Sequence, residues 1–235
     1  MSEVSFPPLF TGQEVTGQID PFDKACVEAV KGCDAGLVVF NLGANLLRGA
    51  IVFAPDVPLR EAMAMLPVCG VGFQNALGAL APPEVAVHLD WDGGLRINGA
   101  SCGRMRVAAS ESAPDAEPLW LVVGLELPLW PESDDPGETP DETTLYAEGC
   151  AEVNAQRLLE SWVKHTLVGI NTWADEGPAA LHKEWRGLAH GVGEDIEMDG
   201  KSGTYLGVDE HFGLLIRDAE TTHLVPLTFL LEGNP

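Results

Sequence analysis

The chain has 235 residues, 46% of them apolar, and its 36 acidic residues outnumber 13 basic ones to give a formal net charge of −23. This length allows a sizeable core in one domain or two, whereas the acidity repels polyanions, so no nucleic-acid partner is expected. No run of eighteen apolar residues occurs, so no membrane-spanning segment is expected either. We interpret the acidity as a solubilising or salt-adapted surface.

The first predicted helix begins at Asp20, after an extended segment over residues 1–19. Asp20 is a typical N-cap, and Pro21 suits the first helical position because its missing N–H would have no partner there. Gly32 is placed to end the helix. The apolar residues predicted to share one face are Phe22, Cys26, Ala29 and Val30.

Two strands and a helical region follow. The strands are predicted over residues 37–40 and 50–53, with a loop between them. Residues 58–80 are rich in Ala, Met and Leu, which favours a buried helical region. Pro67 and Gly70 are expected to divide that region in two, because proline removes a helix hydrogen bond.

The middle of the chain has the pattern of a sheet. Asn98-Gly99 is a strong signal for a two-residue hairpin turn, since both positions of such a turn need positive φ. The apolar run over 120–127 favours a central strand. Residues 128–144 hold four prolines and several acids, which predicts an exposed, mobile loop. The predicted strands cover residues 84–89, 95–98, 102–109 and 120–127.

The clearest helix is predicted over residues 154–173, where an apolar stripe recurs at helical spacing. The stripe consists of Leu159, Trp162, Val163, Leu167, Ile170 and Trp173. A short helix ending near Trp185 is expected next, and then short strands with glycine turns predict a small barrel. This change of pattern predicts two domains, residues 1–187 and 188–235. The barrel strands are predicted over residues 194–198, 203–208, 214–217 and 222–230.

Five scattered cysteines form no Cys-x-x-Cys pair, and the acidic N-terminus lacks the apolar core of a signal peptide. This combination predicts reduced thiols in a cytoplasmic protein and argues against a zinc site, which needs close ligand pairs. Cys102 has no lysine available to activate its thiol, so a small buried core residue is expected there. The six histidines show no ligand spacing, and no catalytic or metal-binding residue is assigned.

Three segments resemble motifs of the biotin protein ligase and lipoate-protein ligase family. Residues 85–105 include Leu-Asp-Trp-Asp-Gly-Gly-Leu and resemble the family segment Val-x-Leu-Lys-Trp-Pro-Asn-Asp-Leu, which is followed by Lys-x-Ala-Gly. Residues 121–127, Leu-Val-Val-Gly-Leu-Glu-Leu, resemble the family strand Val-Val-Gly-Ile-Gly-Ile-Asn. Residues 203–215 resemble the C-terminal barrel of these ligases.

The resemblance implies an α+β fold, in which a ligase-like domain with a mixed, largely antiparallel sheet and helices precedes a small SH3-like β-barrel. It also implies adenylation of a carboxylate and transfer to a lysine. Biotin and ATP with Mg²⁺ would then be the cofactors, and a carrier protein would be the acceptor.

Several departures fall on positions that would handle ATP. Asp90 stands where the family has the first Lys of this segment, and Ala100 stands where it has the second. Asp92, Gly93 and Gly94 replace the family's Pro-Asn-Asp. A nucleotide phosphate near Asp90 would be repelled unless a magnesium ion lay between them.

The phosphate-gathering Gly-Arg-Gly-Arg loop of the family is replaced by residues 41–49, which keep glycines but hold one cation, Arg48. Pro128 replaces the Asn that closes the last strand motif. Adenylation depends on fixed cations that stabilise charge on the reacting phosphates, and one lost donor costs about 10²- to 10³-fold in rate. The departures therefore argue against ATP use and leave the cofactor open.

The candidate ligand-binding residues come from these same segments. Trp91 suits a pocket wall or a buried strand end, and Asp90 with Asp92 suits a cation or amine site or a solvated turn. Gly93 and Gly94 suit tight turns better than a phosphate cradle. The full set is Asn41, Gly43, Arg48, Asp90, Trp91, Asp92, Gly93, Gly94, Ala100, Cys102, Gly103 and Gly124.

Three hypotheses of function stay open. The first is a degenerate ligase-like protein that binds a biotin-, lipoate- or acyl-like carboxylic acid, or a partner protein, without forming an adenylate. The second is a working ligase in which Arg48, Arg104 and Arg106 supply the positive charge and Asp90 with Asp92 holds magnesium. The third is an interaction module that docks a partner through the C-terminal domain and the acidic proline-rich loop.

Overall fold

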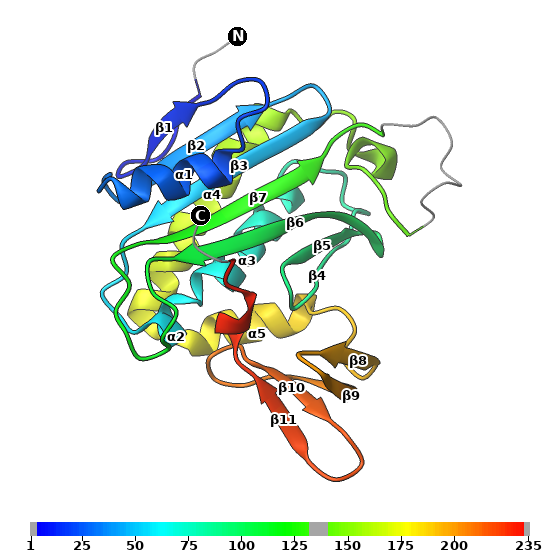
Figure 1. Ribbon diagram of the computed structural model, residues 1–235. Coiled ribbons are helices and arrows are strands. Elements are labelled where there is room, and N and C mark those ends of the chain that lie inside the picture. The colour runs from blue at the N-terminus through cyan, green and yellow to red at the C-terminus, as the bar shows by residue number, and fades with distance from the viewer. Residues whose placement is uncertain (1–3, 132–140, 233–235) are drawn as a thin grey trace.

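The computed structural model describes residues 4–131 and 141–232, and it confirms the predicted α+β fold (Figure 1). A seven-stranded sheet with helices on both faces is followed by a four-stranded antiparallel sheet near the C-terminus. Within the described ranges, no helix is both long and apolar enough to span a bilayer. The loop predicted over 128–144 falls largely on residues 132–140, which lie outside the described residues.

The large sheet has the strand order β1-β2-β3-β7-β6-β5-β4. β1 pairs with β2 in parallel, and the other neighbouring strands of this sheet pair antiparallel. The apolar run predicted as a central strand is β7, which lies between β3 and β6 as expected. The strands are β1 Thr11–Glu14, β2 Leu37–Leu42, β3 Leu46–Phe53, β4 Val87–Leu89, β5 Gly94–Ile97, β6 Ala100–Ala109 and β7 Leu121–Pro128.

Helix α1 (Pro21–Val30) packs across β2, β3 and β7 on one face of the sheet (Figure 1). The Asp20 side chain caps it by accepting a hydrogen bond from the backbone N–H of Phe22 at 2.8 Å, and Pro21 follows as predicted. The predicted face is correct for its first three members, which are buried. It is wrong for Val30, which is 67% exposed because the helix ends there.

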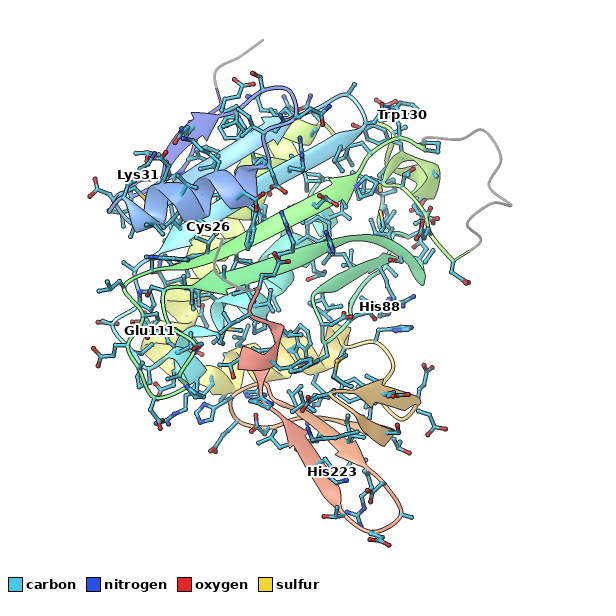
Figure 2. All side chains as sticks on the ribbon, viewed as in Figure 1. Cys26, Lys31, His88, Glu111, Trp130 and His223 are labelled. Carbon is cyan, nitrogen blue, oxygen red and sulfur yellow. The ribbon has the colours of Figure 1, made fainter. Side chains whose placement is uncertain are left out.

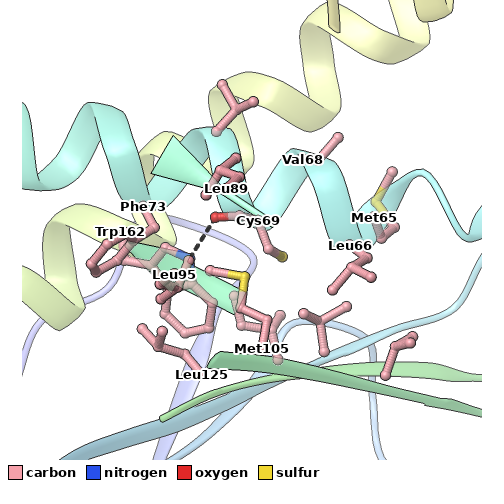
Figure 3. Close-up of a cluster of buried hydrophobic side chains, with 14 of the residues drawn as sticks. Met65, Leu66, Val68, Cys69, Phe73, Leu89, Leu95, Met105, Leu125 and Trp162 are labelled. Carbon is pink, nitrogen blue, oxygen red and sulfur yellow. Dashed lines mark hydrogen bonds between the residues drawn. The ribbon is translucent and has the colours of Figure 1, made fainter. Parts of the chain in front are cut away.

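The opposite face of the sheet is covered by α3 (Met65–Gly78) and α4 (Ala155–Glu176), which pack closely against each other. The indole Nε1 of Trp162 on α4 donates a hydrogen bond to the carbonyl oxygen of Cys69 on α3 at 3.0 Å (Figure 3). This layer also contains α2 (Leu59–Ala62) and α5 (Pro178–Leu188). The apolar stripe predicted for α4 thus faces the core, where Leu159, Trp162 and Val163 are buried.

The helical region is interrupted at residues 63–64, and the predicted break at Pro67 and Gly70 is wrong. Pro67 lies in the first turn of α3, where its missing N–H removes no helix hydrogen bond. Gly72 lets α4 approach closely, because a Cβ there would lie 2.9 Å from Thr166 Oγ1.

The loop predicted over residues 41–49 is mostly strand, because β2 continues to Leu42 and β3 begins at Leu46. Residues 43–45 make the connection, and Asn41 pairs with Arg48 across the hairpin. Both strands are largely apolar and buried on both faces, which fits strands in a sheet that helices cover on both sides. The tight hairpin leaves no long glycine-rich loop at this position.

The small β-unit predicted at the C-terminus is present as a four-stranded antiparallel sheet of order β11-β10-β9-β8. The strand predicted over 222–230 is shorter than expected, since Pro226 ends it and a 3₁₀ turn follows over Leu227–Leu230. The strands are β8 Asp195–Met198, β9 Lys201–Val208, β10 Leu214–Arg217 and β11 Thr222–Val225.

The two sheets are joined through one continuous core. The indole Nε1 of Trp91 donates a hydrogen bond to the carbonyl oxygen of Phe212 at 2.7 Å, which ties the large sheet to the C-terminal sheet. After the 3₁₀ turn the chain returns to the large sheet, where Leu231 bridges Val107 of β6. Figure 1 shows the 3₁₀ turn, in red, leading up to β6.

Candidate functional site

A cleft of about 480 Å³ opens over β5, β6 and β7. Strand alternation sets its polar floor: Arg104, Arg106 and Glu126 point to the α1 face, while Met105 on β6 is buried on the opposite face. The described residues that line the cleft include five carboxylates and two guanidinium groups. They are Asp90, Asp92, Glu126, Glu142, Glu232, Arg104 and Arg106.

Asp90 lies in the turn between β4 and β5, and its carboxylate already has two partners. Arg96 donates from Nε to both carboxylate oxygens at 2.9 Å, and His190 Nδ1 lies 3.1 Å from Oδ1. The His190 ring also meets His88 edge-on at 6.4 Å, and Figure 2 places His88 at the edge of the large sheet next to the C-terminal sheet. Asp90 therefore acts as a link between two parts of the chain.

Asp92 lies in the same turn between β4 and β5. Asp92 Oδ1 accepts a hydrogen bond from the backbone N–H of Gly94 at 3.2 Å. Gly93 has φ of +95°, and a Cβ there would lie 2.5 Å from the Met105 carbonyl oxygen. The geometry of this turn thus requires glycine at position 93.

Arg106 is held by two carboxylates and an aromatic ring. Its guanidinium lies 2.6 Å from Asp20 Oδ2 and 3.6 Å from Glu232 Oε2, and it stacks over the Phe22 ring at 4.3 Å. Burial alone would lower the pKa of Arg106, but the hydrogen bond to Asp20 and the nearby acids outweigh burial and hold it above its usual value. The charge of Arg106 is therefore already compensated.

Arg48 and Arg104 flank Glu126, because both stand opposite it in the strand register. Neither guanidinium lies within ion-pair distance of a carboxylate among the residues that the structure describes. Arg48 Nε is buried without a hydrogen-bond partner and lines a cavity of about 10 Å³ beside the cleft. Arg104 lines the cleft itself, where it is the cation that a ligand can reach.

Trp91 lies below the cleft and is buried, with 4% of its surface exposed. The cavity beside it measures about 20 Å³, which leaves room for about one water molecule and none for a biotin-sized ligand. Apolar side chains from both sheets fill the remaining space. Of the two roles considered for Trp91, the structure favours the buried core residue.

Other candidate residues lie outside the cleft, where local packing accounts for them. Asn41 donates a hydrogen bond to the Val15 carbonyl oxygen at 3.0 Å, Gly43 lies in the β2–β3 connection, and Ala100 begins β6. Cys102 is buried as expected, and burial raises the pKa of its thiol to about 12. These four residues do not converge on the cleft.

Two further candidate glycines are required by close contacts between strands and helices. A Cβ on Gly103 (φ +101°) would lie 2.3 Å from the Glu126 carbonyl oxygen, and one on Gly124 would lie 2.6 Å from Phe22 Cδ2. Gly103 lines the cleft, whereas Gly124 lies beneath α1.

The sequence-based set missed much of the cleft. Glu126 has a usable signal in the sequence, because it is a charged residue within the apolar run of β7. Strand alternation puts its side chain on the same face as Gly124 and Pro128. Glu232 has none, because the return of the C-terminal segment to β6 depends on the whole fold. No group of three or more His, Cys, Asp or Glu side chains able to hold a metal ion occurs within residues 4–131 and 141–232.

A family model described as the biotin/lipoate A/B protein ligase family matches residues 6–187. A second model, described as a domain of unknown function (DUF4444), matches residues 192–233. The comparison with curated proteins returned no relative.

Solved structures with the same fold include one close in sequence and several remote ones. A biotin protein ligase-like protein of unknown function from Silicibacter sp. TM1040 is 65% identical, with a TM-score of 0.94 over 98% of this chain and 100% of that one. The biotin protein ligase from Aquifex aeolicus in complex with biotin and ATP is 16% identical, with a TM-score of 0.69 over 93% and 96%. The Leishmania major enzyme in complex with biotinyl-5-AMP is 16% identical, with a TM-score of 0.58 over 93% and 99%.

Proposed function

Because the chain belongs to the biotin/lipoate A/B protein ligase family, we propose that it binds a small carboxylic acid in the cleft without converting it to an adenylate. The ligand is a biotin-, lipoate- or acyl-like molecule, free or presented by a partner protein. Arg104 meets the ligand carboxylate, since it lines the cleft and, within residues 4–131 and 141–232, no carboxylate lies within ion-pair distance of it.

The balance of charge in the cleft carries this proposal. Five carboxylates line it against two guanidinium groups, and one of those, Arg106, is already held by Asp20 and Glu232. Charge on a reacting phosphate is stabilised by preorganised cations, and each missing donor costs about 10²- to 10³-fold in rate. The residues present do not fit a nucleotide triphosphate.

Magnesium does not readily repair this mismatch. Asp90 would have to release Arg96 and His190 before it could bind a cation. The Asp92 carboxylate already accepts a hydrogen bond from the backbone of its own turn. The family's phosphate loop also has no counterpart, since residues 43–45 close the β2–β3 hairpin with no basic side chain. We therefore derive no ATP-dependent step.

Calorimetry and isotope exchange test the proposal together. We expect biotin, lipoate or a fatty acid to bind, ATP not to bind, and no carboxylate-dependent exchange between ATP and pyrophosphate. Arg104→Ala should weaken acid binding by about tenfold, the loss of one charge-assisted contact, while Arg157→Ala on α4 should leave it unchanged. Exchange above background, or equal binding by both variants, contradicts the proposal.

A working ligase with a rebuilt site is the second candidate. The strand register favours it, because Arg48 and Arg104 lie on the same face on either side of Glu126. This candidate requires biotin- or lipoate-dependent pyrophosphate exchange that Arg48→Ala abolishes. Absence of exchange across a broad panel of carboxylic acids would eliminate it.

An interaction module is the third candidate, and the dense packing around Trp91 favours it. On this reading the cleft is vestigial, and the C-terminal domain after residue 187 with the acidic loop over 128–144 docks a partner protein. Failure of every small acid to bind the cleft would support this candidate over the first.

A further inference from the structure

A second concave surface lies between α5 and β9, and it is separate from the cleft. This α5–β9 groove has a volume of about 720 Å³ and shares no lining residue with the cleft. One wall is a single face of the α5 helix, since the residues recur at helical spacing. They are Ala179, His182, Lys183, Arg186 and Ala189.

Much of the other wall of the groove is apolar, and Asp209 and Glu210 lie at its end. Leu206 on β9 and Val192 before β8 are each 47% exposed, which is high for branched aliphatic side chains that face a hollow. Apolar groups outweigh polar ones over the whole lining. Exposed apolar surface with a polar rim is typical of a site that another molecule covers.

Two buried polar groups at the floor of the groove interact with each other, since a side-chain hydrogen bond from the first lowers the pKa of the second. They are the indole N–H of Trp185 and the hydroxyl of Tyr205, and both residues line the groove. Burial raises the pKa of Tyr205 to about 12, so its hydroxyl stays protonated. This aromatic pair closes the floor, so contacts to a bound molecule come from the walls of the groove.

The charges on the α5 wall are unusual for this chain. Lys183 and Arg186 are exposed, and neither forms an ion pair with a residue that the structure describes. The chain has 13 basic residues against 36 acidic ones, so two unpaired cations beside one apolar groove are a local exception. Two acids also line the groove. Asp209 is occupied by backbone N–H groups of His211 and Gly213, and the exposed Glu210 lies 3.8 Å from His211 Nε2.

We propose that the α5–β9 groove docks an acidic, partly apolar segment of a partner protein. Its carboxylates pair with Lys183 and Arg186, and its apolar side chains cover Leu206 and Val192. Charge complementarity at the groove selects this occupant, because a short segment carries few charges and meets only Lys183 and Arg186. A second copy with its net charge of −23, or a nucleic acid, also meets the acidic remainder of the surface and is repelled. The inference goes beyond the proposed function, because the groove and the cleft are separate.

A short fluorescein-labelled peptide of glutamate, leucine and serine serves as the probe, with fluorescence anisotropy as the readout. The double variant Lys183→Glu/Arg186→Glu should weaken its binding by about tenfold or more, because two attractive charges become repulsive. The matched control is Arg157→Glu/Lys164→Glu on α4, which changes the net charge equally outside the groove and should bind like the wild type. Leu206→Ser tests the apolar contact separately.

The outcomes are decisive in both directions. Groove variants that bind the peptide as well as the control variant does, or no binding by the wild type up to about 1 mM, overturn the inference. A peptide with glutamine in place of glutamate should bind weakly, and equal binding would also contradict it. Binding of small acids in the cleft should be unchanged in the groove variants, so failure here is distinguishable from failure of the proposed function.

Discussion

Single side chains decide which charges the cleft can offer. Arg106 was a candidate cation in the sequence, yet Asp20, Glu232 and Phe22 hold it as a link between α1, β6 and the C-terminal segment. Arg104 comes from the same strand two residues earlier, and its guanidinium pairs with no carboxylate in the part of the chain that the structure describes. The sequence shows the residue types and the alternation of side chains along the strand. It does not show which acidic groups pair with each arginine.

Gly124 illustrates a residue whose small size is needed for packing. A Cβ there would lie 2.6 Å from Phe22 Cδ2, so Gly124→Ala should lower the free energy of unfolding by about 1–3 kcal/mol through overpacking. Urea denaturation measures this change. The control is Gly187→Ala near the end of α5, where no atom lies within 4 Å of the new Cβ, and stability should stay equal or rise. A Gly124→Ala protein as stable as wild type would refute the packing argument.

Among the elements, α1 shows how one residue can serve both a helix and a site. Asp20 caps α1 through the Phe22 N–H and also pairs with Arg106 on β6. The sequence predicted the cap from the Asp-Pro pair, because capping is a local interaction. It did not predict the ion pair, which joins residues far apart in the chain.

Two substitutions at Asp20 separate these roles. Asp20→Asn keeps a capping oxygen but removes the charge opposite Arg106, whereas Asp20→Ala removes both. We therefore expect Asp20→Ala to be less stable than Asp20→Asn by about 1 kcal/mol, the usual worth of an N-cap. Urea midpoints of the two variants measure the difference. Equal midpoints would show that the cap contributes nothing at this helix.

The elements that sequence patterns predicted well are those whose signals are local. The hairpin turn at Asn98-Gly99 is present with φ of 52° and 96°, and the long α4 helix begins after its cap at Asn154. The β2–β3 hairpin was predicted as a loop because its glycines and polar residues break the apolar pattern. Long-range pairing with β7 stabilises these strands regardless of their local propensity.

At the scale of the molecule, one continuous core joins both sheets. The chain as a whole carries a net charge of −23. Buried residues of the C-terminal sheet belong to this core, and the division into two domains, residues 1–187 and 188–235, stays a prediction. Self-repulsion among so many carboxylates opposes the compact state. Stability should therefore depend on salt.

Urea titrations at low and high sodium chloride test this dependence. Salt screens exposed charges, with a Debye length of about 10 Å at 0.1 M, so the midpoint should rise as sodium chloride increases from about 10 mM to 0.5 M. Potassium chloride should act in the same way, since screening depends on ionic strength, and the slope of the unfolding curve should stay constant. A midpoint that is flat or falls with salt would contradict the role of self-repulsion.

The candidate site was predictable in part. The segment over 85–105 was singled out from its motif, and Asp90, Asp92, Gly94 and Gly103 do line the cleft. Trp91 was placed near the site by the same motif, yet packing against the C-terminal sheet buries it. The carboxylates that complete the lining come from distant segments, which no local pattern connects to the cleft.

The sequence by itself determined the family, the α+β class, the order of most elements and the shortage of cations, because these follow from residue types, local propensities and motif spacing. The tertiary structure decided which charges are compensated, which pocket is filled and where the α5–β9 groove opens. Those properties depend on contacts between residues that are remote in the chain. The energy of such a contact depends on the distance between the groups and on their burial, and neither is set by the neighbouring residues in the sequence.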